Sequence, residues 1–163
     1  MSGNKYGTRI LVIPEDDANA DLVNGFLLHP ALDQRVIQVQ SCAGGWSKVR
    51  EKFHSDFENG MKRYPNRHVV FLIDFDERDD RLEKMTSAIP EALRERVFVL
   101  GIWKEAEEVT RVGLGTREEV GFKLASECFD EDKDVWNHDM LKHNANELAK
   151  LEARLRQFLF PPR

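Results

Sequence analysis

The stretch HVVFLIDFDERDD, residues 68–80, joins an apolar run to an abrupt series of acidic residues. The run is short, rich in Val, Phe and Ile, and preceded by polar residues, which is typical of a strand buried on both faces. The acidic series begins at Asp74, where the run ends. Carboxylates gathered at the end of a buried strand need a physical reason, because like charges held close together repel.

Other parts of the chain repeat this strand pattern and alternate it with helical patterns. In residues 46–64 apolar side chains recur every three or four positions, as on one face of a helix. Predicted strands cover residues 9–13, 35–41, 68–75 and 96–103. A further predicted helix covers 22–27, after an acidic start, and another lies within 76–90 and ends before Pro90. This alternation predicts an α/β fold, with a mostly parallel four-stranded sheet flanked by helices.

The last third of the chain has helical patterns only. Residues 104–163 form a predicted helical extension of a core that covers residues 8–103. The final helix has an apolar stripe made of Leu141, Leu148, Leu151, Leu155 and Phe158. With 163 residues, the chain is expected to form one domain.

Composition and charge limit the possible functions. The sequence is 41% hydrophobic and 33% charged, and no apolar stretch approaches the ~20 residues that span a bilayer. The first residues lack the pattern of a secretory signal, so we expect a cytoplasmic protein. The net charge of −5 opposes unaided binding to nucleic acid, since phosphate affinity comes mainly from Lys and Arg.

Acidic residues follow two of the predicted strands. Glu15, Asp16 and Asp17 follow the first strand, and Asp74 and Asp76 follow the third. If these strands are neighbours, the carboxylates meet at the edge where parallel sheets bind ligands. In an extended strand, alternate residues point to the same side, so the Asp pair could face one ion. Mg²⁺ or Mn²⁺ would neutralise such a cluster.

The same residues also have a simpler interpretation. The EDD sequence at 15–17 could cap a helix, and DERDD at 76–80 could be an exposed acidic turn. Each cluster taken alone is typical of such structural roles, and their position on the same sheet edge favours a functional site.

In order and spacing, these motifs resemble the TOPRIM domain of topoisomerases, primases and overcoming-lysogenization-defect nucleases. The resemblance covers residues 8–103 and rests on Glu15 in ILVIPEDD, Gly44 and Gly45 in VQSCAGGWSKV, and Asp74 with Asp76 in FLIDFD. It implies Mg²⁺ held by the Asp pair, Glu15 as a general acid/base or additional ligand, and cleavage or joining of phosphodiester bonds. The nuclease branch is the nearest relative, so the expected function is a metal-dependent nuclease.

The resemblance extends to further residues and to partners. Glu105 and Glu107 occupy positions where the nuclease branch places additional metal ligands. Lys104 and Arg78 are candidates for phosphate contacts. The nuclease relatives are commonly joined to, or encoded beside, an ATPase, so a partner could supply the basic surface that this acidic chain lacks. DNA or RNA would be the substrate.

Two alternatives remain open. The chain also resembles response-regulator receiver domains, with the acidic ILVIPEDD motif and Asp74 as phospho-acceptor, although a receiver expects a fifth strand with a Lys and only helical patterns follow residue 104. The other alternative is a noncatalytic TOPRIM-like module that docks through its long C-terminal helix.

Overall fold

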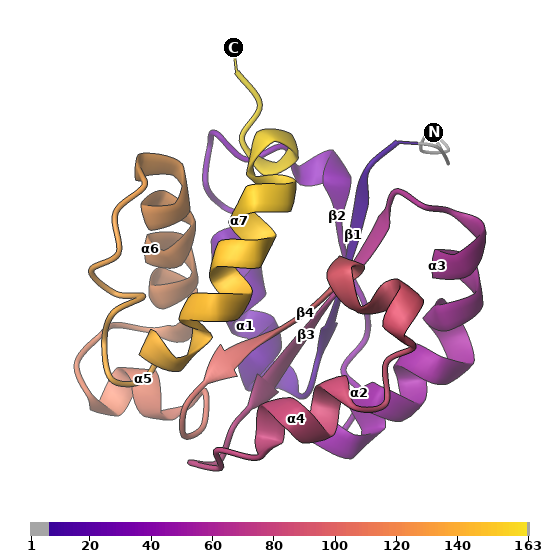
Figure 1. The fold of residues 1–163 in the computed structure, drawn as a ribbon. Coiled ribbons are helices and arrows are strands. Elements are labelled where there is room, and N and C mark those ends of the chain that lie inside the picture. The colour runs from indigo at the N-terminus through magenta and orange to yellow at the C-terminus, as the bar shows by residue number, and fades with distance from the viewer. Residues whose placement is uncertain (1–6, 163) are drawn as a thin grey trace.

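Four parallel strands form the centre of the computed structural model, which describes residues 7–162 (Figure 1). The strands are β1 (Arg9–Pro14), β2 (Ile37–Val39), β3 (Arg67–Asp74) and β4 (Val97–Ile102), in the order β2-β1-β3-β4. All three neighbouring pairs are parallel. The α/β class is therefore confirmed, and the first and third predicted strands are neighbours, as expected.

Side chains alternate between the two faces of the sheet. In β3, Val69, Phe71 and Ile73 belong to one hydrophobic cluster, whereas Val70 and Leu72 pack in the other. Both faces are apolar because helices cover both, which explains why the strands read as continuous apolar runs.

Four helices cover the face that contains Val70: α1 (Asp17–Phe26), α5 (Glu108–Arg111), α6 (Arg117–Asp130) and α7 (Ala145–Leu159). The helices α1 and α6 cross at two glycines. A Cβ atom at Gly25 would overlap the backbone oxygen of Glu118, and one at Gly121 would overlap the backbone oxygen of Leu22. The two backbones can therefore approach this closely only because both positions lack a side chain.

The opposite face is covered by α2 (Trp46–Lys52), α3 (Glu58–Arg63), α4 (Arg81–Thr86) and the 3-10 segment η3 (Glu91–Arg96). The helix predicted at 46–64 is present, but a π-helical turn, η2 (Phe53–Phe57), separates α2 from α3. Phe53 and Met61 are fully buried, whereas Phe57 between them is partly exposed. The π-helical turn adds one residue to the helix. This extra residue lets the apolar residues on both sides of the turn remain packed against the sheet.

Strand β4 is at an edge of the sheet, and polar side chains from the C-terminal segment satisfy its backbone. Asn144 accepts a hydrogen bond from the backbone nitrogen of Gly101 at 3.0 Å and donates one to its oxygen at 2.9 Å. Glu147 Oε1 accepts from the backbone nitrogen of Val99 at 3.0 Å and pairs with Arg94. These bonds close an edge that would otherwise be open to another strand.

Three predicted boundaries are wrong. The second strand is only Ile37–Val39 because the 3-10 segment η1 (Gln34–Val36) precedes it, and the helix predicted at 76–90 is reduced to α4. The last helix begins at Ala145, after a short 3-10 segment, η4 (Lys142–Asn144). The chain bends before it because Glu127 accepts hydrogen bonds from the backbone nitrogens of Val135 and Trp136.

The predicted apolar stripe of the last helix is also wrong at its end. Phe158 is 38% exposed, whereas Leu159 is 4% exposed and belongs to the core. Leu151, Leu155 and Leu159 are spaced by four residues, which keeps them on the buried face. Phe158 is one position out of this row and faces solvent.

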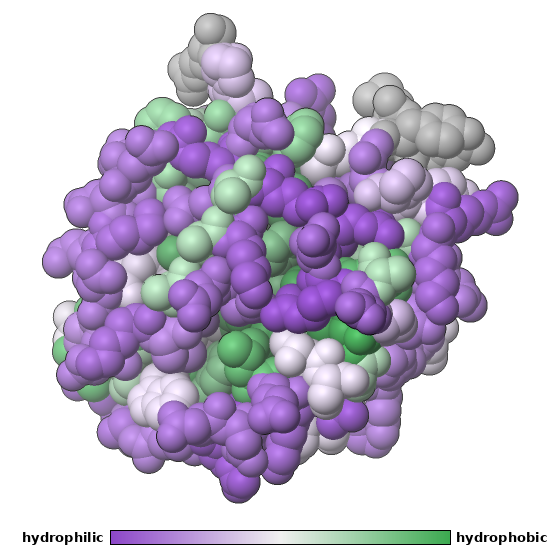
Figure 2. Space-filling model, in the orientation of Figure 1, coloured by the Kyte–Doolittle hydropathy of each residue, from purple (hydrophilic) through white to green (hydrophobic). Residues whose placement is uncertain are grey.

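The face of the molecule shown in Figure 2 is mainly hydrophilic, with a small hydrophobic area between α7 and α4. This agrees with the mean hydropathy of −0.52. Among residues 7–162, no helix has the length and apolar character needed to cross a membrane.

Candidate metal site

Three carboxylates meet at the edge of the sheet where β1 and β3 end. Glu15, Asp16 and Asp74 each place one carboxylate oxygen within 4.8 Å of the others. Glu15 directly follows β1, and Asp74 is the last residue of β3. The convergence of Glu15 and Asp74 that the sequence predicts is therefore confirmed, and it follows from the parallel pairing of the two strands.

Asp74 is the buried member of the group, with 5% exposure. Its Oδ1 accepts hydrogen bonds from Asn19 Nδ2 at 3.1 Å and from the backbone nitrogen of Ala106 at 3.0 Å. Its own backbone nitrogen donates to Glu15 Oε1 at 3.0 Å. Segments that follow β1 and β4 therefore fix this side chain in one orientation.

Asp16 has two structural roles in addition to its place in the group. It is the N-cap of α1, where Oδ1 accepts from the backbone nitrogen of Asn19 at 3.0 Å and from Asn19 Nδ2 at 2.9 Å. The sequence interpretation of EDD as a helix cap is confirmed for this residue, and Asp16 is among the carboxylates expected at this edge. It is not predicted as a metal ligand, and the link that Asn19 makes between Asp16 and Asp74 is missed. The i, i+3 spacing of Asp16 and Asn19 was the available signal.

The environment raises the pKa of two carboxyl groups. Burial raises the pKa of Glu15 to about 6, with Asp16 and Asp76 adding to the rise, while the hydrogen bond from Asp74 and the charge of Arg81 oppose it. Burial also raises the pKa of Asp74 to about 7, assisted by the charges of Glu15 and Asp16. Keeping both groups charged therefore costs free energy in the folded protein. A bound cation would offset this cost.

Asp76 does not pair with Asp74 in the way that the sequence predicts. The strand ends at Asp74, and Asp76 and Glu77 have φ angles of 52° and 58°, so the alternation of an extended strand does not continue. The carboxylate of Asp76 is 2.9 Å from Arg81 Nη1 and lies outside the group of three. Its charge still contributes to the raised pKa of Glu15.

Glu105 and Glu107, predicted from their position as further ligands, have exposed side chains outside this group. The segment contributes a backbone nitrogen instead, at Ala106 between them. The candidate phosphate contacts also have acidic partners: Arg78 pairs with Asp80, and Lys104 lies 3.5 Å from Glu77.

The two glycines of the predicted motif lie beside Glu15. The backbone nitrogen of Gly44 donates to the backbone oxygen of Glu15 at 2.8 Å. Gly44 and Gly45 have φ angles of 97° and 147°, which side chains disfavour. A Cβ atom at Gly44 would meet no atom within 4 Å, so the glycine is needed for its backbone conformation and not for space.

Arg81 is a buried positive charge behind the carboxylates, which sequence reasoning missed. Its side chain is 6% exposed, and Nη1 donates to the backbone oxygen of Asp74 at 3.0 Å as well as to Asp76. The guanidinium carbon lies 4.5 Å from the ring centroid of Trp46, at the start of α2. Arg81 thus links α2 and α4 to the end of β3.

The donor set fits a small divalent cation. All three side chains offer carboxylate oxygens, which Mg²⁺ and Mn²⁺ prefer. On an octahedral Mg²⁺ with bonds of about 2.1 Å, adjacent ligands are about 3.0 Å apart and opposite ligands about 4.2 Å, so oxygens that lie within 4.8 Å of one another would move closer together around a bound ion.

Comparisons of the chain with family models, with curated proteins and with solved structures return no match.

Proposed function

We propose that the protein is a metal-dependent nuclease, with a TOPRIM-like site in which Glu15, Asp16 and Asp74 hold Mg²⁺ or Mn²⁺. The observation that carries the proposal is the convergence of these carboxylates within 4.8 Å at the carboxyl edge of two adjacent parallel strands. This edge is where open α/β sheets bind ligands. The motif order Glu15, Gly44–Gly45, Asp74 adds support.

A cation held there would stabilise the charge that develops on a phosphodiester during hydrolysis. The residues of the chain have separate tasks. Asp74 is oriented by Asn19 and Ala106, so it is the fixed ligand. Glu15 is only half-buried, and its pKa is about 6 in the absence of an ion, so it can exchange a proton near neutral pH when it does not contact the ion. We therefore assign Glu15 the acid/base role and Arg81 the role of holding the end of β3 in place.

The substrate and partner follow from the chemistry of the reaction. A nuclease with a net charge of −5 requires positive charge from elsewhere to bind DNA or RNA well. Arg78 and Lys104 already have acidic partners. We therefore include in the proposal a basic partner protein, such as an ATPase, that brings the nucleic acid to the site.

The proposal is tested by measuring Mg²⁺ and Mn²⁺ binding by calorimetry together with cleavage of single- and double-stranded DNA and RNA. We expect wild-type protein to bind the ions and to cleave a substrate, and Asp74→Asn to lose both. Glu95→Gln is the matched control because the Glu95 side chain is 89% exposed and lies just before β4, at the opposite end of the sheet. Metal binding without cleavage, with and without basic partner proteins, would favour the noncatalytic module. Absence of metal binding would overturn the proposal.

A further inference from the structure

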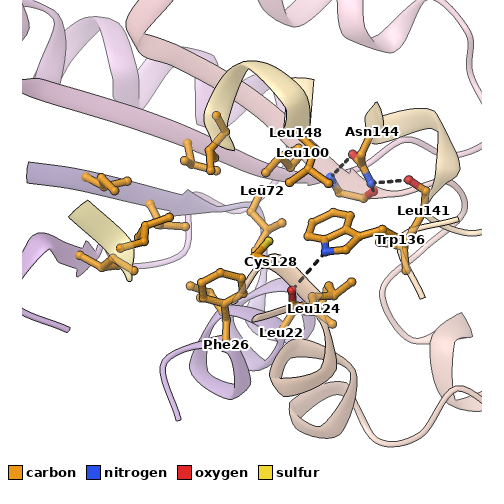
Figure 3. A pocket seen from close by; sticks show the side chains of 18 of the residues that line it. Leu22, Phe26, Leu72, Leu100, Leu124, Cys128, Trp136, Leu141, Asn144 and Leu148 are labelled. Atoms are coloured by element: carbon orange, nitrogen blue, oxygen red, sulfur yellow. Dashed lines mark hydrogen bonds between the residues drawn. The ribbon is translucent and has the colours of Figure 1, made fainter. Parts of the chain in front are cut away.

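A pocket lies inside the molecule, on the side of α1 that faces the sheet. It is an apolar pocket of about 100 Å³ between the sheet and the helices α1, α6 and α7 (Figure 3). Val12 and Val70 line it from the sheet, Leu22 and Leu124 line it from α1 and α6, and Leu148 lines it from α7. Protein interiors seldom leave voids larger than a water molecule, so a space of this size is unusual.

The pocket offers no free hydrogen-bonding group from the polar side chains that line it. The amide of Asn144 is used by the backbone of Gly101 and by the oxygen of Leu141, and Trp136 Nε1 donates to the oxygen of Leu124 at 3.1 Å (Figure 3). Cys128 is buried, which raises the pKa of its thiol to about 12 and keeps it neutral. A water molecule needs two to four polar partners, so this lining disfavours water.

The lining follows the strand direction. It includes Ile10, near the start of β1, and Leu72, which is four residues beyond the strand partner of Ile10 in β3. At about 3.3 Å per residue, these positions are about 13 Å apart along the sheet. Phe26, Ile37 and Leu72 are the partly exposed lining residues, so the wall is thinnest at the edge near β2 and near the end of β3. The volume of about 100 Å³ limits the occupant to a small molecule or the end of a chain.

We infer that this pocket binds a small apolar molecule or the end of a short alkyl chain, at a site separate from the carboxylates. Apolar cavities of comparable volume remain dry and take up xenon or small hydrocarbons. Binding would be favourable because the ligand would make van der Waals contacts with the lining atoms, which have no partners on the side that faces the void. Both the mainly apolar lining and the volume support this ligand class.

Thermal unfolding in the presence of n-pentane or xenon tests the inference. At about five times the dissociation constant, the melting temperature of the wild type should rise by about 2–4 °C, because the probe binds only the folded state. Methyl NMR should show perturbed signals for Val70 and Leu72 and unchanged signals for Val69 and Val99, which pack on the other face of the sheet. No rise with either probe, or perturbations confined to other residues, would overturn the inference.

A pair of matched variants places the probe in the pocket. Val70→Ile adds a methylene that occupies part of the space, so it should raise the melting temperature without probe and reduce the probe-induced shift by at least half. Val69→Ile makes the same change at the neighbouring residue, which is fully buried on the opposite face, and should keep the full shift. Full retention of the shift in Val70→Ile would show that the probe binds elsewhere. If either variant fails to fold, the methyl NMR signals of the wild type still show whether the probe binds in the pocket.

Discussion

The backbone nitrogen of Asp74 donates a hydrogen bond of 3.0 Å to Oε1 of Glu15, although 59 residues separate them in the sequence. Parallel pairing of β1 with β3 brings the two strand ends together. The bond therefore joins the carboxylate of Glu15 to the backbone of the residue that carries the buried carboxylate. A neutral substitution at Glu15 changes both the charge of the group and the connection between the strands, whereas Asp74→Asn changes the charge and keeps the backbone donor.

Replacement of Asp74 by Asn should separate electrostatic cost from structural support. Asn can still accept from Asn19 and Ala106 through its amide oxygen, but it carries no charge. At pH 8 in EDTA we expect a melting temperature equal to or a few degrees above that of wild type, because repulsion and desolvation are relieved. Millimolar Mg²⁺ should stabilise wild type and not the variant. If the variant has a lower melting temperature than wild type, and Mg²⁺ does not change the melting temperature of wild type, the role of Asp74 is purely structural.

The pH dependence of stability should be shallow between pH 8 and 5, because two pairs of groups with opposite effects nearly balance. The folded protein binds protons at Asp74 and Glu15, with pKa values of about 7 and 6, which the unfolded chain releases, so these two groups stabilise the fold as the pH falls. Burial lowers the pKa of both His68 and His143 to about 4. The unfolded chain binds protons at these histidines from about pH 6.5 downward and the folded protein does not, so the histidines destabilise the fold over the same range. Thermal unfolding from pH 8 to 4.5 in EDTA checks this, and Asp74→Asn, which lacks the carboxyl with the higher pKa, should lose stability steadily below about pH 7.

Much of the fold follows from local patterns, but part of the site does not. The apolar run before Asp74 and the periodicity of residues 46–64 predict a buried strand and a helix, and the alternation predicts a parallel sheet. The parallel pairing then places Glu15 beside Asp74. The position of Asp76 cannot be predicted in this way, because a left-handed turn at two residues without glycine leaves no signal in the sequence.

The close approach of α1 and α6 is a similar case. Gly25 and Gly121 look like weak points in two helices, since glycine has a low helix propensity. Their value is visible only in the packed structure, where each faces backbone atoms of the other helix.

Gly121→Ala should therefore destabilise the protein even though Ala is the better helix former. The added Cβ overlaps the backbone of α1, and forced overpacking costs about 1–3 kcal/mol. That corresponds to a fall in melting temperature of roughly 2–12 °C for a chain of this size. Ser126→Ala, on the same helix, is the control and should change the melting temperature little. An unchanged or higher value for Gly121→Ala would contradict the crossing described above.

Incubation with acetyl phosphate and Mg²⁺ distinguishes the nuclease from a receiver domain. A receiver would carry an acid-stable, base-labile phosphoryl group on Asp74, which mass spectrometry detects. We expect none, because Asp74 is 5% exposed and its Oδ1 already accepts two hydrogen bonds. The sheet formed by residues 7–162 also has four strands, without the fifth that a receiver requires. Phosphorylation in wild type that is lost in Asp74→Asn would favour the receiver.

Asp76 provides the sharpest test of which carboxylates hold the ion. Asp74 belongs to the group of three, whereas Asp76 is itself in a left-handed turn and pairs with Arg81. We therefore expect Asp74→Asn to weaken Mn²⁺ binding at least tenfold in calorimetry. Asp76→Asn should weaken it only about two- to fivefold, since removing a charge near the site costs about 0.4–1 kcal/mol.

The control for this comparison is Glu95→Gln, which removes one exposed charge at the opposite end of the sheet and should leave the affinity unchanged. Equal losses in Asp74→Asn and Asp76→Asn would mean that Asp76 leaves Arg81 and joins the ion when it binds. The paired Asp residues of the sequence motif would then be correct for the bound state, and the arrangement with Asp16 would be that of the free protein.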